Sequence, residues 1–222
     1  MSRVVVKLGG GAARRSLGLV RELHAAGDEV VVVHGAGPQI SAELSSLGVP
    51  TRFVGGRRVT DAAAMEVVRS SLVAVGAELC DALGGLAVQL VGDELGLEAV
   101  PVPKLGLVGD PLPSRPPALE EALRAGRIPV VTPLAVGPLN VNADEAATAL
   151  AAGLEARRLI FVSDVPGVYV EGSVVSRLEA DRATALLDAG VFDGGIVPKL
   201  LAAVRAARAG IAAEIGETAV VA

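Results

Sequence analysis

"RVVVKLGGGAARRS" (residues 3–16) joins an apolar, β-branched run to a lysine and three consecutive glycines. The run predicts a short buried strand at 4–6 that ends in a glycine-rich loop. A second stretch, "VVVVHGAGPQI" (30–40), repeats the arrangement, because another apolar strand ends in glycines just before a helical segment. Glycines let backbone N–H groups approach an anion closely, and a helix N-terminus favours negative charge. Each loop is therefore either half of a phosphate cradle or a tight turn from strand to helix.

Neither loop matches an established nucleotide-binding motif. A Walker P-loop has its lysine after the glycines, whereas Lys7 precedes Gly9. A dinucleotide fingerprint needs a third glycine where Ile40 stands, and an acidic residue about 20 positions later that this sequence lacks. The tight-turn interpretation stays open for each loop alone, but two such loops facing each other could hold a phosphoryl group from both sides.

Strands and helices alternate along the whole chain, which predicts an α/β fold. We expect a three-layer αβα sandwich around a mostly parallel sheet with both faces covered. The chain of 222 residues shows no linker or repeat, so 1–222 is read as one domain. Strands are expected at 4–6, 29–33, 87–90, 128–131, 159–162 and 219–221. Helices are expected at 16–26, after 34–38 as far as residue 47, and at 61–83, 118–125, 144–153, 180–190 and 197–209. Irregular or hairpin structure is expected at 91–117.

Composition excludes several classes of function. Apolar residues make up 51% of the chain and aromatic residues 2%, so the core is expected to be aliphatic. A net charge of −5 and few stacking side chains argue against a nucleic-acid partner. No apolar run reaches membrane length and no signal peptide precedes Arg3, so we expect a cytoplasmic protein without a membrane partner. A single cysteine, Cys80, excludes an internal disulfide and a cysteine metal site.

Polar residues gather before one predicted helix. In "GPLNVNADEAATALAAG" (137–153), Asn140, Asn142 and Asp144 occupy alternate positions between a strand and an Ala-rich helix. A helix N-cap needs one such residue and is worth about 1 kcal/mol. The other two are therefore candidates for chemistry.

Two further loops carry candidate ligand-binding groups. "FVSDVPGVYV" (161–170) ends a buried strand in Ser163-Asp164, and "DGGIVPKLLAAV" (193–204) places Lys199 at the start of a helix. A lysine is unfavourable at a helix N-terminus unless it has an anionic partner. A solvated surface lysine remains an equal alternative for this residue.

Taken together, these segments resemble the amino-acid kinase family and, within it, the acetylglutamate kinases. The resemblance covers roughly residues 3–210, and a further segment (87–110) is similar to the family's hairpin region beside the acyl substrate. Six motifs occur in the family's order, and the order is more specific than any one of them: "VVVKLGGG", "VVVVHGAGPQI", "GGRRVTDAAAMEVV", "NVNADEAATALAAGL", "LIFVSDVPGVY" and "DGGIVPKLLAAV".

The resemblance implies a kinase that moves the γ-phosphoryl group of ATP onto the side-chain carboxylate of N-acetyl-L-glutamate, in arginine biosynthesis. The product is an acyl phosphate, formed without a covalent enzyme intermediate. Mg²⁺ would arrive with ATP, so no dedicated protein metal site is expected. One alternative is a kinase for aminoadipate or glutamate attached to a small acidic amino-group carrier protein, in lysine or arginine biosynthesis. Another is a non-catalytic ligand-binding member of the family.

Residue roles follow from the same resemblance. Lys7 would stabilise the transferring phosphoryl group, Lys199 would meet the leaving β-phosphate side, and Asp144 would hold both ammonium groups. The remaining assignments are phosphate binding by Gly9, Gly10, Gly35, Ala36 and Gly37; substrate binding by Arg58, Asn140 and Asn142; and nucleotide binding by Ser163 and Asp164. A basic surface at Arg52, Arg57 and Arg58 would favour the carrier-protein alternative.

The chain also departs from the family pattern. Ala36 replaces the middle glycine of one phosphate loop, and Ala77-Glu78 replaces an Asn-Lys pair near the acyl substrate. We expect an acid-substrate and dimerisation lobe at 1–154 and a nucleotide lobe at 155–222. Compared with the family pattern, we expect the nucleotide lobe to be shortened after Gly210. Because the chain begins at its first strand, we expect a homodimer without arginine feedback.

Overall fold

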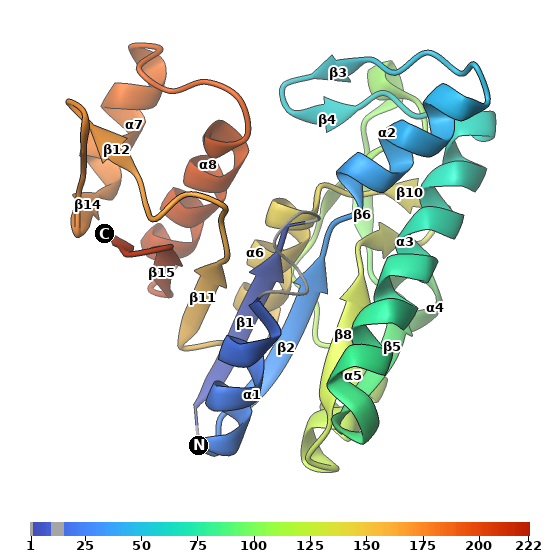
Figure 1. Ribbon diagram of the computed structural model, residues 1–222, viewed down its shortest axis with the longest axis horizontal. Helices are drawn as coiled ribbons and strands as arrows, with labels where there is room; N and C mark the ends of the chain where they lie inside the picture. The colour runs from blue at the N-terminus through green and yellow to red at the C-terminus, as the bar shows by residue number, and fades with distance from the viewer. Residues whose placement is uncertain (1, 10–15) are drawn as a thin grey trace.

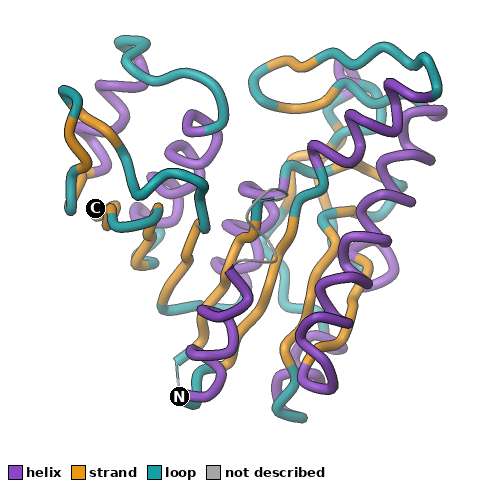
Figure 2. Tube along the Cα trace, in the orientation of Figure 1, coloured by secondary structure: helices purple, strands orange, loops and turns teal. Residues whose placement is uncertain are grey.

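A computed structural model describes residues 2–9 and 16–222, which form one central sheet with helices on both faces (Figures 1 and 2). The sheet has the order β14-β16-β15-β11-β1-β2-β8-β5, and only β16 runs antiparallel to its neighbour β15, with β14 parallel to β16. The strands are β1 (Arg3–Leu8), β2 (Glu29–His34), β5 (Ala87–Val91), β8 (Ile128–Thr132), β11 (Arg158–Phe161), β14 (Arg177–Glu179), β15 (Ala212–Ile215) and β16 (Thr218–Val221).

The two faces of β1 pack into two separate clusters. Val4 and Val6 pack with α1, α2 and α3, whereas Val5 packs with α5, α6, α7 and α8. The alternation follows from the two-residue period of a strand, and the near-continuous valines of β1 and β2 suit strands covered on both sides. The predicted three-layer sandwich is confirmed. The helices are α1 (Leu17–Ala25), α2 (Gly37–Ser46), α3 (Ala62–Leu83), α4 (Gly92–Leu95), α5 (Pro117–Arg124), α6 (Ala143–Gly153), α7 (Ala180–Asp188) and α8 (Ile196–Arg208), with short 3₁₀ turns at Gly84–Leu86 and Pro103–Leu105.

In the described part of the chain, four small hairpins lie near the carboxyl ends of the sheet strands (Figure 1). The hairpin expected within 91–117 is β6–β7, whereas the other three escaped prediction because two-residue strands carry no readable periodicity. The pairs are β3 (Phe53–Val54) with β4 (Arg57–Arg58), β6 (Ala99–Pro101) with β7 (Gly109–Pro111), β9 (Leu134–Ala135) with β10 (Leu139–Asn140), and β12 (Tyr169–Val170) with β13 (Ser173–Val174).

The chain closes its sheet with a tight turn after β15. Gly216 has φ +54°, and a Cβ at this position would lie 2.2 Å from the carbonyl oxygen of Pro166. Glycine is therefore required here by both conformation and space. The segment after Gly210 forms β15, this turn and β16, and β16 in turn pairs with the edge strand β14.

The parallel register brings three strand ends together. Lys7 of β1 is level with Val33 of β2 and with Phe161 of β11. The carboxyl ends of these strands therefore lie side by side, at the edge where ligands bind in open α/β sheets. None of the helices in the described part of the chain has the length and apolarity to cross a bilayer.

Candidate active site

Lys7, Asp144 and Lys199, which are far apart in the sequence, meet in one cluster. Strand alternation points Lys7 to the same face as Val5, the face that α6 and α8 cover. Lys7 Nζ lies 2.9 Å from Asp144 Oδ1, and Lys199 Nζ lies 3.9 Å from the same oxygen. The side chains of Lys7 and Asp144 are only 7% and 6% exposed. The structure thus brings together all three residues predicted as catalytic.

The cluster carries a net charge of +1, which suits an anionic ligand. Asp144 lies in the first turn of α6, where the helix dipole stabilises a carboxylate. Burial lowers the pKa of Lys199 below its ordinary value, and the charge of Lys7 lowers it further, while Asp144 and Asp164 act in the opposite direction. The two ammonium groups share one buried carboxylate, and Asp164 adds a further negative charge near Lys199.

Gly9, Gly35 and Gly37 line the same cleft as this cluster. A Cβ added at Gly9 or Gly35 would be no closer than 3.6 Å to any neighbour, and one at Gly37 would meet nothing within 4 Å. Packing does not demand glycine at these positions, so the missing side chains leave room for a ligand. The N–H of Gly35 donates to the carbonyl of Leu8. Helix α2, which starts at Gly37, has no side-chain cap, so its first backbone amides have no side-chain acceptor. Gly10 lies outside the described residues.

Arg58 projects into a cleft of about 470 Å³ beside the cluster. It is 6% exposed, and it donates only to neutral oxygens: Ser41 Oγ at 2.8 Å, the carbonyl of Gly37 at 3.2 Å and Thr51 Oγ1 at 3.3 Å. No ion pair joins it to any described carboxylate, and burial without such a partner lowers its pKa. Its guanidinium also stacks on Phe53, 4.7 Å from the ring centroid. A buried guanidinium without a carboxylate partner can form charge-assisted hydrogen bonds with an anionic ligand from solution.

The two predicted asparagines have different positions in this cleft, which we call the acid cleft. Asn140 Nδ2 donates to Thr60 Oγ1 at 3.0 Å, and that hydroxyl donates to the carbonyl of Arg58 at 2.9 Å. Asn142 is the N-cap of α6, because its Oδ1 accepts from the amides of Asp144 and the next residue. Both asparagines line the acid cleft; Asn142 caps α6, whereas Asn140 supports the backbone of Arg58 through Thr60.

A second cleft of about 490 Å³ adjoins the first, and we call it the nucleotide cleft. Ser163 and Asp164, predicted to bind nucleotide, both line it, together with the start of α8. Like α2, α8 has no side-chain cap at its N-terminus. The two clefts share four residues, and their junction is therefore at the lysine cluster: Gly9, Asp164, Gly195 and Lys199.

Aromatic side chains mark both clefts. The chain has only four aromatic residues; Phe161 is fully buried in the core, whereas Phe53 lines the acid cleft and Tyr169 and Phe192 line the nucleotide cleft. Sequence reasoning did not assign these three to the site. Their rarity in an otherwise aliphatic protein was the available signal, since a core built from Ala, Val and Leu does not need them.

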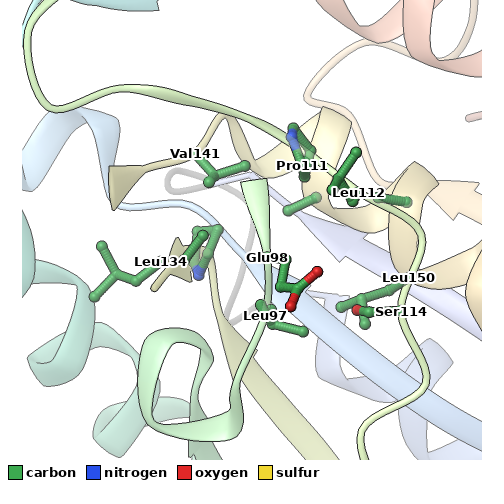
Figure 3. Close-up of a pocket in the computed structure, with 12 residues that line it drawn as sticks. Leu97, Glu98, Pro111, Leu112, Ser114, Leu134, Val141 and Leu150 are labelled. Atoms are coloured by element: carbon green, nitrogen blue, oxygen red, sulfur yellow. The ribbon is translucent and has the colours of Figure 1, made fainter. Parts of the chain in front are cut away.

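A third pocket, between α6 and the β6–β7 hairpin, is unrelated to the cluster (Figure 3). Leu97, Leu134, Val141 and Leu150 supply apolar walls, and the volume is about 10 Å³. A space of that size holds about one water molecule. It is a packing defect and not a substrate site.

The family model described as "Amino acid kinase family" matches residues 2–217. The chain belongs to this family. Acetylglutamate kinase from Saccharopolyspora erythraea is 44% identical over 213 residues, which cover 85% of this chain and 69% of the relative. Acetylglutamate kinase from Rubrobacter xylanophilus is 40% identical over 224 residues, which cover 97% and 88%. The resemblance inferred from the six motifs is confirmed.

Solved structures of amino acid kinase fold agree with this assignment. The structure of smu.665 from Streptococcus mutans has a TM-score of 0.90 and 29% identity, over 99% of this chain and 98% of that one. N-acetylglutamate synthase from Neisseria gonorrhoeae, solved with coenzyme A and N-acetyl-glutamate, has a TM-score of 0.85 at 21% identity and covers 100% of this chain and 59% of its own. At that identity the second likeness shows the fold alone.

Proposed function

We propose that this member of the amino acid kinase family phosphorylates the side-chain carboxylate of N-acetyl-L-glutamate with ATP, giving an acyl phosphate and ADP. The relatives named acetylglutamate kinase, at 38–44% identity over most of the chain, support this activity. The observation that carries it is the position of Lys7, Asp144 and Lys199 where the acid cleft and the nucleotide cleft meet.

The chemistry follows from the charges at this junction. A carboxylate oxygen of the acid attacks the γ-phosphorus of ATP as the bond to the β–γ bridging oxygen breaks, so charge moves onto ADP. Lys7, which reaches the acid cleft, stabilises the equatorial oxygens, while Lys199, which borders both clefts, stabilises the leaving side. Asp144 holds the two ammonium groups in place before the substrates arrive, so little reorganisation accompanies transfer.

Nucleotide binding is assigned to the cleft between β11 and α8. Ser163 lies at the end of β11, the uncapped first turn of α8 offers N–H donors to phosphates, and Tyr169 and Phe192 offer apolar walls to the base. Mg²⁺ would enter with ATP and would neutralise charge on the phosphates. Asp164, which lines both clefts, is the residue that would meet this hard cation.

Recognition of the acid is assigned to Arg58. Its planar fork suits the α-carboxylate of an N-blocked amino acid, and Asn140 supports it through Thr60. Ile40, Leu72 and Val108 also line the cleft and suit an uncharged acyl group.

The ion pairs of Arg57 favour a free acid over a carrier-linked acid as the proposed substrate. This arginine is ion-paired with Asp110 and Glu145, so it does not add free positive charge to a docking surface around the cleft. The homodimer, and the division into lobes at 1–154 and 155–222, remain part of the proposal.

A hydroxamate assay for acyl phosphate tests the proposal. Acetylglutamate, acetylaminoadipate and carrier-bound substrates are compared in parallel with ATP and Mg²⁺. We expect product with free acetylglutamate at a kcat/KM well above the others. Product only with the carrier-bound acid would move the assignment to the carrier-protein kinase. No product with any acid would leave the non-catalytic ligand-binding alternative.

A further inference from the structure

Two neighbouring arginines on β4 have opposite environments. Arg58 has no carboxylate partner among the described residues, whereas Arg57 is held by two. Arg57 Nη2 lies 2.7 Å from Glu145 Oε1 and also pairs with Asp110 of β7. The Arg57 and Glu145 side chains are only 18% and 16% exposed, so solvent screens this pair less than a surface pair.

Glu145 stands where three parts of the candidate active site meet. It follows Asp144 in the first turn of α6, and Asn142 accepts from the backbone amides of both. Its carboxylate lies 3.8 Å from Arg205 on α8, the helix that carries Lys199. One side chain thus adjoins the elements that carry the acid-binding arginine, the bridging carboxylate and the second lysine.

The β3–β4 hairpin needs an anchor outside itself. Each strand has two residues, and such a short isolated hairpin is not stable alone. Its apolar residues contribute little burial, since Phe53 is 54% exposed and Val54 is 45% exposed. The hairpin lies above the strand ends and extends towards α8 (Figure 1). A Cβ at Gly56 in its turn would lie 3.6 Å from the ring of Pro198, which precedes Lys199.

The ion pair also closes one side of the acid cleft. Arg57 lines the acid cleft and a neighbouring groove of about 330 Å³, whose walls include Asp110, Glu145 and Arg205. The guanidinium therefore lies between the two spaces, and both of its ion-pair partners lie on the groove side. This position makes Arg57 part of the cleft wall.

We propose that Glu145 is a positioning residue: through its ion pair with Arg57 it holds β4, and therefore Arg58, at the depth in the acid cleft that aims a bound acid at Lys7. The inference rests on the proposed function. If Arg57 instead contacted the acid directly, removing the charge of Glu145 would free that arginine and tighten binding. The two possibilities thus predict opposite changes for the same substitution.

The test compares Glu145→Gln, Arg57→Gln and the double variant in the hydroxamate assay. We expect KM for acetylglutamate to rise about fivefold or more in each single variant, because Arg58 would then meet the acid from a shifted position. The double variant should be no worse than the singles, because both remove the same pair. KM for ATP should stay within about twofold, since the pair does not border the nucleotide cleft.

Two matched controls separate positioning from general stability. Arg158→Gln removes an arginine–glutamate pair of 3.0 Å at the start of β11, away from the clefts, and Arg205→Gln removes only the longer, exposed contact to Glu145. We expect KM for acetylglutamate to be unchanged in both controls. Melting temperatures are measured for all variants, and KM is compared at a temperature where each variant is fully folded, so that a raised KM in Glu145→Gln does not reflect unfolding.

An unchanged or lowered KM in Glu145→Gln, beside a raised KM in Arg57→Gln, would overturn the inference while leaving the proposed function intact. If the wild-type protein makes no acyl phosphate with any acid, the proposed function fails instead. Hydrogen exchange of the amides at 53–58 then decides the inference: Glu145→Gln should speed exchange there relative to wild type and Arg158→Gln, and identical exchange in all three would refute it.

Discussion

Replacing Lys7 by methionine gives the sharpest test of the lysine cluster. Methionine has a comparable length and keeps the apolar contacts of the side chain, so the change removes mainly the charge. Two ammonium groups and one carboxylate give the cluster a charge of +1, and the substitution brings it to zero. Lys199 stays 3.9 Å from Asp144, so the buried carboxylate keeps a cationic partner and the fold is expected to persist.

The expected loss follows from what one fixed charge contributes at a reacting centre. Removing one preorganised group that stabilises transition-state charge costs about 2.7–4 kcal/mol, or about 100- to 1000-fold in kcat. KM for ATP should change much less, because the nucleotide cleft keeps Lys199 and the first turn of α8. The assay is hydroxamate formation at saturating ATP and acetylglutamate, with circular dichroism to check the fold.

The pH profile adds a second, independent readout. Lys199 must be protonated to stabilise the leaving phosphate, so activity falls as pH rises through its pKa. Burial and the charge of Lys7 both lower that pKa. Removing Lys7 therefore raises it, and the alkaline limb of kcat should move to higher pH in the variant while the maximum falls. A kcat within about threefold of wild type, or an unmoved alkaline limb, would refute the reasoning.

Three further variants separate binding, capping and turn formation. Arg58→Ala should raise KM for acetylglutamate about 10- to 100-fold with a smaller change in kcat, since hydrogen bonds to charged groups contribute about 1.5–3 kcal/mol; an effect on kcat alone would argue against an acid-binding role. Asn142→Ala should lower the free energy of unfolding by about 1 kcal/mol in urea titration through the lost cap of α6; full stability would show that the cap is dispensable. Gly216→Ala should cost about 1–3 kcal/mol or more because of the positive φ and the nearby Pro166 carbonyl, and an unchanged midpoint would contradict the turn geometry.

The sheet was predictable where the strands are apolar and long. β1, β2, β8 and β11 were all expected within one or two residues, because short apolar runs rich in valine, isoleucine or leucine leave few alternatives. β15 escaped prediction because Ala212 and Ala213 have low strand propensity. Its place in the sheet is fixed by pairing with β11 and β16, which only the fold supplies.

In the candidate site, too, local sequence patterns predict some residues, and only the fold places the others. Period-two alternation gives the face of Lys7 from the sequence, and the capping pattern limits the N-cap of α6 to Asn142 or Asp144, because both depend on neighbours along the chain. Adjacent residues on one strand point to opposite faces, so alternation separates Arg57 from Arg58 but does not say which face is the cleft. β4 presents the Arg57 guanidinium to Glu145, whereas Arg58 enters the cleft without a described carboxylate partner. Charge pairing across elements therefore supports Arg58, the arginine that the motif resemblance also indicated, as the proposed acid-binding residue.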